Sequence, residues 1–129
     1  MIGTLALVFA GLAALLHVYI FVLESVRWTK PATWRVFGIA DQQTAETTRP
    51  LAYNQGFYNL FLAIGAAIGI VLWIAHGTGD VAGRTLLIFS LGSMVAAALV
   101  LLTSGRRYLR PASIQGTLPV IGLVLAILA

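Results

Sequence analysis

The sequence predicts an all-α membrane protein: an up-down bundle of four transmembrane helices, with a short interfacial helix between helices 1 and 2. The first observation is composition, because the 129 residues are 60% hydrophobic and only 9% charged, with a mean hydropathy of +0.95. A soluble domain has about 25% charged residues, so this chain lacks the polar side chains to cover a water-facing surface. The second observation is that four apolar runs reach the roughly 20 residues that a helix needs to cross a bilayer.

These runs predict spans at about residues 2–24, 51–75, 85–104 and 111–129, within a single domain that covers residues 1–129. The runs are continuous, whereas the strands of a membrane barrel alternate between apolar and polar residues, so helices are favoured. The first run lacks a basic start, and no small-residue cleavage site follows it. We therefore interpret it as a retained span rather than as a signal peptide.

The first connection is the only long one. Trp34 and Phe37 lie three residues apart in it and Trp28 precedes them, which predicts an interfacial helix at about residues 31–40 with its aromatic side chains among the lipid headgroups. The polar stretch "DQQTAETTRP" follows, and Pro50 is expected to open the second span at its first turn. The second connection, "HGTGDVAGR", is a glycine-rich turn, and the third, "GRRYLRP", is a tight turn whose proline starts the last span.

The basic residues predict the orientation. Seven of the eight Lys and Arg residues lie in the first and third connections, which share one side of a four-span protein, and only Arg84 lies in the second. The positive-inside rule makes the two basic connections cytoplasmic and places both termini outside. The seven are Arg27, Lys30, Arg35, Arg49, Arg106, Arg107 and Arg110. We do not expect nucleic-acid binding, because it requires a basic face on a soluble scaffold, and the absence of cysteine excludes disulfides and thiol chemistry.

Small and polar residues recur at helical spacing in each predicted span, as on a face turned toward other helices. In the second span, Asn54, Tyr58, Gly65 and Gly69 fall within roughly 60° of one another at about 100° per residue. The pattern "GAAIG" lets helices approach closely, and we interpret it as intramolecular packing rather than dimerisation. The stripes of the other spans are Ala10, Ala13, Ala14, His17 and Glu24; Ser90, Ser93, Ala97 and Ser104; and Gln115, Pro119, Gly122 and Ala126. The outer half of the stripes is mainly Ala and Gly, which predicts a polar pocket open to the cytoplasm. The polar residues that fall in the cytoplasmic half are Glu24, His17, Asn54, Tyr58, Asn59, Ser104 and Gln115.

Three segments, "HVYIFVLESVRW", "NQGFYNLFLA" and "QGTLP", resemble a family of small bacterial four-helix membrane proteins that is catalogued only as a domain of unknown function. The resemblance covers nearly the whole chain, and "NQGFYNLFLA" is its most specific part. It implies a multi-pass protein of the bacterial cell (inner) membrane and brings no established activity. The signature positions that it marks are His17, Glu24, Trp28, Asn54, Gln55, Gly56, Tyr58, Asn59, Gln115 and Gly116.

Three amides, those of Asn54, Gln55 and Asn59, lie within one and a half turns of an otherwise apolar helix. They need partners, because an unsatisfied polar group in hydrocarbon costs several kcal/mol. A purely structural network between helices is one reading, and a ligand pocket is the reading we favour. The candidate ligand-binding residues are His17, Glu24, Asn54, Gln55, Tyr58, Asn59 and Gln115.

His17 and Glu24 are seven residues apart, about 10 Å along a helix axis, so a water, the Tyr58 hydroxyl or a substrate would have to bridge them. Histidine titrates near neutrality, which makes general acid–base catalysis chemically possible. The structural alternative is that His17 donates one hydrogen bond to a neighbouring helix and that Glu24 pairs with Arg27 or Lys30. We expect no metal and no cofactor, because the other histidine falls at the opposite membrane face and cysteine is absent.

Three functions fit these features. The first is a protein that binds or transports a small polar or amphipathic, lipid-like molecule, with a homo-oligomer expected for transport because four helices are few. The second is an intramembrane enzyme in which His17, Glu24 and Tyr58 move protons on a lipophilic substrate. The third is an accessory subunit of a membrane complex, whose polar stripe meets a partner.

Overall fold

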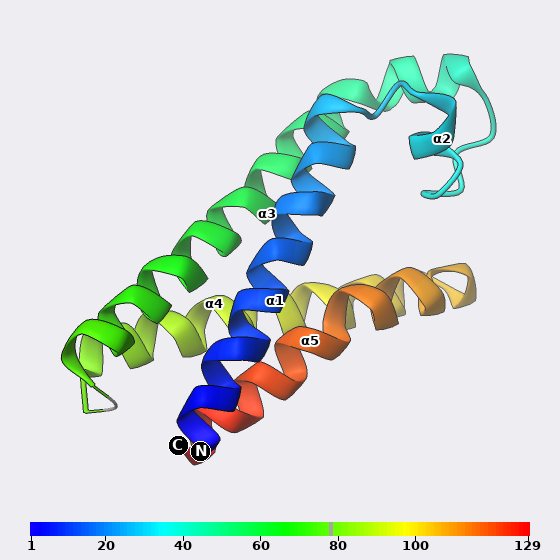
Figure 1. The fold of residues 1–129 in the computed structure, drawn as a ribbon. Coiled ribbons are helices and arrows are strands. Elements are labelled where there is room, and N and C mark those ends of the chain that lie inside the picture. The colour runs from blue at the N-terminus through cyan, green and yellow to red at the C-terminus, as the bar shows by residue number, and fades with distance from the viewer. Residues whose placement is uncertain (78) are drawn as a thin grey trace. The chain divides into compact units, whose positions relative to one another are not determined.

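The computed structural model of the chain is all-α and describes residues 1–77 and 79–129 (Figure 1). Thr78, in the predicted glycine-rich turn, lies outside the described residues. Four helices are long and apolar enough to cross a membrane, and a short helix lies between the first two. These spans are Ile2–Val26, Gln42–His76, Val81–Thr103 and Arg106–Leu128. The predicted fold class is confirmed, and the chain is a multi-pass membrane protein.

The chain divides into two compact units. Unit 1 comprises Met1–Leu16 and Leu62–Ala129, and unit 2 comprises His17–Phe61, so that the first and second spans contribute to both. The elements are α1 (Ile2–Phe21), the π-helical turn η1 (Val22–Val26), α2 (Pro31–Trp34), α3 (Gln42–His76), α4 (Val81–Thr103), the 3-10 turn η2 (Arg106–Tyr108) and α5 (Leu109–Leu128).

Unit 1 is a four-helix bundle built from residues 2–16 of α1, residues 62–76 of α3, and all of α4 and α5. Figure 1 shows α4 and α5, yellow to red, running alongside each other. The core residues are mostly alanines on α1 and α3, with larger apolar side chains from α4 filling the space between them. They are Ala6, Ala10, Ala13, Ala14, Ala63, Ala66, Trp73, Leu87, Leu91, Met94 and Ala126.

Two glycines bring α3 and α4 into backbone contact within unit 1. A Cβ added at Gly69 would lie 2.8 Å from the Leu87 backbone nitrogen, and one added at Gly83 would lie 2.8 Å from the Trp73 backbone nitrogen. Asp80 caps the first turn of α4, since its Oδ2 accepts a hydrogen bond from the Gly83 amide at 2.7 Å. The "GAAIG" pattern therefore serves packing within the chain, as predicted.

The predicted inward stripes agree with the structure on α1 and α5 and disagree on α4. The α1 stripe is buried throughout, and on α5 only Gln115 is less than fully buried. On α4, Ala97 and Ser104 are exposed. The physical reason is volume: the alanine-lined faces of α1 and α3 leave space that leucine and methionine fill better than serine. The buried α4 residues are Gly83, Leu87, Ser90, Leu91, Met94 and Ala98.

Helix α3 is longer than predicted. Its 35 residues span about 52 Å, against about 30 Å of hydrocarbon, and it begins nine residues before the expected start at residue 51. The prediction that Pro50 opens this span is wrong, because Pro50 lies inside the helix. Proline removes one helical hydrogen bond, and the carbonyl that loses its partner is that of Glu46, an exposed residue that water can reach.

Asp41 caps the start of α3, and this predicts a pH dependence. Its Oδ1 accepts a hydrogen bond from the Thr44 amide at 2.7 Å, and this bond holds the pKa of Asp41 below its ordinary value of 3.8. A lowered pKa stabilises the helix start above the ordinary value and stops doing so as the pH falls through the folded value. We expect the Thr44 amide to lose protection from hydrogen exchange below pH 3.8, and Asp41→Asn to remove that pH dependence. Equal pH profiles for both proteins would contradict this.

The first connection docks on the start of α3 within unit 2. The indole nitrogen of Trp28 donates to the Ala45 carbonyl and to Thr48 Oγ1, both at 3.1 Å, and the indole nitrogen of Trp34 donates to Gln42 Oε1 at 3.0 Å. Both rings are more than nine-tenths buried. The prediction that Trp28 and Trp34 lie among lipid headgroups is therefore wrong, because the polar first turns of α3 supply the acceptors that a buried indole needs. For half-buried Phe37 it stays a prediction. We call residues 27–41 the docked loop.

The helix inside the docked loop is shorter than predicted. It covers four residues, Pro31–Trp34, rather than residues 31–40. Gln42 ties the loop to α3, because its amide nitrogen donates to the Thr29 carbonyl at 3.0 Å and to Glu46 Oε1 at 2.9 Å. In Figure 1 this part of the chain, in cyan, lies beside the first turns of α3.

Candidate functional site

The first span ends in a π-helical turn that carries Glu24. The Arg27 amide bonds to the Val22 carbonyl at 2.9 Å, five residues back. Such a turn inserts one residue into the α-helical register, and single π-turns are frequent at functional sites. Glu24 keeps only 7% of its surface exposed. The sequence predicted that Glu24 faces inward, but nothing in "VLESV" signalled the π-turn.

Glu24 pairs with Asn59 of α3. The Asn59 side-chain nitrogen donates to Glu24 Oε2 at 2.9 Å and to the Gln55 carbonyl at 3.2 Å. The second carboxylate oxygen, Oε1, accepts no hydrogen bond from any residue in 1–77 or 79–129. The structural alternative, in which Glu24 pairs with Arg27 or Lys30, is wrong, because the partner of Glu24 is the amide of Asn59 on α3.

Gly56 is the point where the end of the first span touches α3. A Cβ added there would lie 3.1 Å from Glu24 Cβ and 3.0 Å from the Ser25 backbone nitrogen, and it would collide with Ser25 Oγ. Ser25 Oγ donates to the Tyr53 carbonyl at 2.8 Å. The side chains of Glu24 and Ser25 therefore straddle Gly56, with Glu24 reaching Asn59 on one side of it and Ser25 reaching Tyr53 on the other.

The two sides of Gly56 differ in chemistry. At about 100° per residue, Asn59 and then Gln55 follow Gly56 around α3 in one direction, and we call these two residues the amide side. In the other direction lie Tyr53 and Phe57, whose rings are 4.9 Å apart, with the Phe21 ring 5.1 Å from that of Phe57. We call these three the aromatic side. The Glu24 carboxylate is thus at the edge of a helix contact, next to exposed Gln55.

Asn54 and Tyr58 do not lie on the face of α3 that packs within unit 2. Both are exposed, Tyr58 to 61%, and the buried residues of that face are Ala52 and Gly56. The inward stripe was wrong for these two residues because the closest helix contact forms where the side chain is smallest. Their part in a ligand site stays a prediction.

The remaining candidates are His17 and Gln115. His17 is fully buried at the start of unit 2. Gln115 is half-buried on α5, in unit 1. Their membership of the same site as Glu24 stays a prediction. Within unit 2 the structure brings together Glu24 and Asn59, which also bonds to the Gln55 backbone carbonyl, and it adds Gly56 and Ser25. Gly56 was a signature position but not a candidate ligand residue. Nothing in the sequence around Ser25 predicted that its side chain contacts α3.

Comparison with known proteins gives the chain a family. The family model described as "Protein of unknown function (DUF1304)" matches residues 11–127. The chain belongs to this family. The resemblance to a family of unknown function is thereby confirmed, and the match covers the Glu24–Asn59 pair. No curated protein and no solved structure matches the DUF1304 chain.

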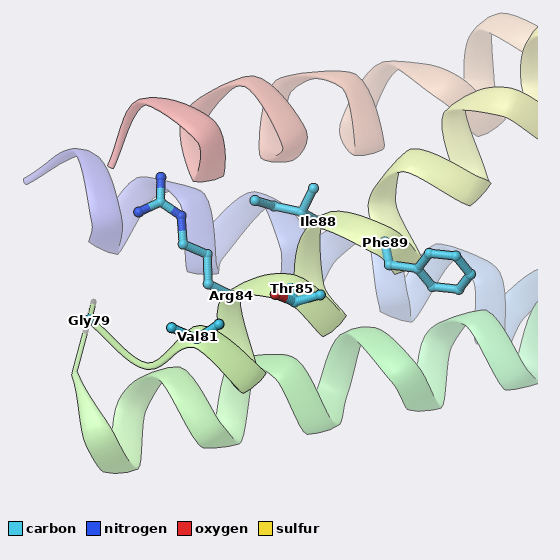
Figure 2. A pocket seen from close by; sticks show the side chains of 6 residues that line it. All are labelled: Gly79, Val81, Arg84, Thr85, Ile88 and Phe89. Atoms are coloured by element: carbon cyan, nitrogen blue, oxygen red, sulfur yellow. The ribbon is translucent and has the colours of Figure 1, made fainter.

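The DUF1304 chain also has an open depression in unit 1, with a volume of about 490 Å³ (Figure 2). Its walls are mostly apolar, and its one charged residue is Arg84, whose Nη2 donates to the Ile127 carbonyl at 2.9 Å. That bond satisfies a carbonyl that the end of α5 would leave without a helical partner, so Arg84 has a structural task. The lining residues are Gly79, Val81, Arg84, Thr85, Ile88 and Phe89. None belongs to the predicted polar pocket.

The chemistry open to the Glu24–Asn59 pair is that of an acceptor. A carboxylate at the end of a membrane span can bind a proton, a cation or a neutral donor, and its burial makes such a partner more favourable than it is in water. Acid–base catalysis by Glu24 together with Tyr58 is less well supported, because Tyr58 is exposed and lies roughly 160° around α3 from Gly56 at about 100° per residue.

Proposed function

We propose that this DUF1304 protein binds, and in an oligomer transports, a small polar or amphipathic molecule at a site centred on Glu24 and Asn59. One observation carries the proposal: a buried carboxylate within a membrane span has one oxygen bonded to Asn59 and the other bonded to no described residue. Ionisable groups within spans are costly and usually functional. A ligand with an N–H or O–H group would donate to the second oxygen.

A purely structural role accounts less well for this carboxylate. Hydrogen bonds between membrane helices contribute about 0.6 kcal/mol on average, and two neutral side chains could provide that without burying a charge. Gly56 and the Ser25–Tyr53 bond already join the first span to α3. Glu24 is therefore not required for the contact between the first span and α3.

We further propose that the site opens to the cytoplasm. Glu24 lies two residues before the end of the span Ile2–Val26, next to the docked loop, and this loop belongs to the side that the positive-inside rule makes cytoplasmic. Because the chain has no cysteine, single cysteines introduced at exposed Lys30 and at exposed Gly79 provide a direct test. A membrane-impermeant thiol reagent added to intact cells should label only the cysteine at position 79, and the reverse pattern would refute the orientation.

Native mass spectrometry from mild detergent tests the binding function. We expect the wild-type protein to carry a small-molecule adduct that Glu24→Gln and Asn59→Ala both lose, because each variant removes one member of the pair. Glu46→Gln is the matched control: it makes the same change at an exposed glutamate of α3 in the same unit. Circular dichroism and melting of each variant establish that it is folded.

Two results would overturn the binding function. The first is an adduct that persists unchanged in folded Glu24→Gln. The second is the absence of any adduct from several expression hosts, together with co-purification of a larger membrane complex. The second result would favour the accessory-subunit role, for which the exposed Asn54 and Tyr58 supply a polar face on α3.

A further inference from the structure

We propose that the ligand of the Glu24–Asn59 site is an amphipathic primary ammonium compound, whose N–H groups donate to Glu24 and Asn59 while its hydrocarbon chain lies in the bilayer. This inference rests on the proposed function and specifies the class of ligand. It follows from which polar atoms of the pair are already bonded and which are left.

The donors of the pair are used within the protein. An ionised carboxylate only accepts hydrogen bonds, so the amide group of Asn59 must turn its nitrogen toward Glu24. Its two N–H groups then donate to Glu24 Oε2 and to the Gln55 carbonyl. The polar atoms that remain are Glu24 Oε1 and Asn59 Oδ1, and neither accepts a hydrogen bond from any residue in the described part of the chain. Both are acceptors, so a ligand that binds to them must supply the donor.

The charge of the site selects the donor. No ion pair reaches Glu24 from the described residues, and the nearest basic residues along the chain, Arg27 and Lys30, are exposed in the docked loop. Burial without a counterion disfavours the ionised carboxylate, so a cation that binds here also stabilises the charged form of Glu24. An anionic ligand such as a phosphate or a carboxylate would add repulsion, whereas a cationic donor neutralises the charge and forms charge-assisted bonds, which are roughly twice as strong as neutral ones.

A metal cation fits these residues less well than an ammonium group. Ca²⁺ and Mg²⁺ take about six or more oxygen ligands, and no three His, Cys, Asp or Glu side chains gather anywhere in residues 1–77 and 79–129. An ammonium group needs only acceptors. A primary ammonium carries three N–H donors, enough for Glu24 Oε1 and Asn59 Oδ1 with one left for exposed Gln55.

The surroundings fit an amphiphile with a small head. Glu24 lies near the end of its span, the depth at which the head of a membrane-bound amphiphile meets water. On the other side of Gly56 the aromatic side offers apolar surface, with Tyr53 53% exposed. Because Glu24 keeps only 7% of its surface exposed, a bulky quaternary head that also lacks N–H groups would bind poorly.

Four probes with the same ten-carbon chain separate charge, donor capacity and hydrophobicity: decylammonium, decyltrimethylammonium, decanol and decanoate. Each is titrated against the protein in nanodiscs of zwitterionic lipid, with empty nanodiscs subtracted, by calorimetry and by the shift in melting temperature. We expect decylammonium to bind at least about tenfold more tightly than the other three, a difference of about 1.4 kcal/mol. Glu24→Gln should abolish the preference for decylammonium over decanol, and Glu46→Gln should keep it.

The outcomes separate the two proposals. Equal binding of decylammonium by wild type and folded Glu24→Gln, or tightest binding of the trimethyl probe, would overturn the primary ammonium class. If decanol or decanoate binds best and Asn59→Ala abolishes that binding, the cation class falls while the proposed function stands. If no probe binds and no adduct depends on Glu24, both fall.

Discussion

Replacing Trp28 by alanine is expected to release the docked loop from α3 and to destabilise unit 2 by about 3–5 kcal/mol, the usual cost of truncating a buried tryptophan. The ring is 92% buried, its centroid is 5.0 Å from that of Phe37, and its N–H is shared between the Ala45 carbonyl and Thr48 Oγ1. Hydrogen exchange should report the loss: at about 1.4 kcal/mol per tenfold, amides of the first turns of α3 should exchange roughly 10²–10⁴ times faster.

Two further variants separate packing from hydrogen bonding. Trp28→Phe keeps one aromatic ring but removes the N–H and part of the indole, so it should cost more than the about 0.5–1.5 kcal/mol of one hydrogen bond and less than Trp28→Ala. Phe89→Ala removes an aromatic ring that is 69% exposed on α4, and it should leave exchange at the start of α3 unchanged. Unchanged protection of residues 42–50 in Trp28→Ala would show that the loop does not hold this part of α3.

The sequence predicted the four spans well because hydropathy depends on composition alone. It did not predict the first nine residues of α3, since "QQTAETTRP" carries neither an apolar run nor a helical stripe. This segment is helical because tertiary contacts hold it: Asp41 caps it, and the two buried indoles of the docked loop find their acceptors on it. Such contacts between residues up to 20 positions apart are outside the reach of a local pattern.

The sequence predicted that Glu24 faces inward but did not predict that its partner is Asn59, and the part of both residues in a ligand site stays a prediction. The π-turn after Phe21 adds one residue to the register, and the face assigned at about 100° per residue nevertheless holds as far as Glu24, which is buried. On α3 the inward face was assigned from the polar residues, which gave Asn54 and Tyr58, whereas the residues that are buried are Ala52 and Gly56. Glycine contributes no hydropathy signal, yet the absence of its side chain decided where the two helices meet.

Replacing Gly69 by alanine is expected to separate α3 from α4 and to lower the free energy of unfolding of unit 1 by about 1–3 kcal/mol, the range for overpacked cores. The added Cβ would lie 2.8 Å from the Leu87 backbone nitrogen and 3.0 Å from the Leu87 Cα. Both are backbone atoms, so no side-chain rotation relieves the contact and one helix must move. Reversible unfolding in mixed micelles or bicelles measures the change.

Gly92→Ala is the matched control, because it makes the same substitution within a membrane helix of the same unit, at a position where nothing lies within 4 Å of the added Cβ. Alanine is favoured over glycine in a helix interior by up to about 1 kcal/mol, so this variant should unfold at equal or greater denaturant strength than wild type. The two substitutions are thus expected to have opposite signs. A Gly69→Ala protein as stable as Gly92→Ala would contradict the close approach of α3 and α4, and with it the role of the "GAAIG" pattern in holding unit 1 together.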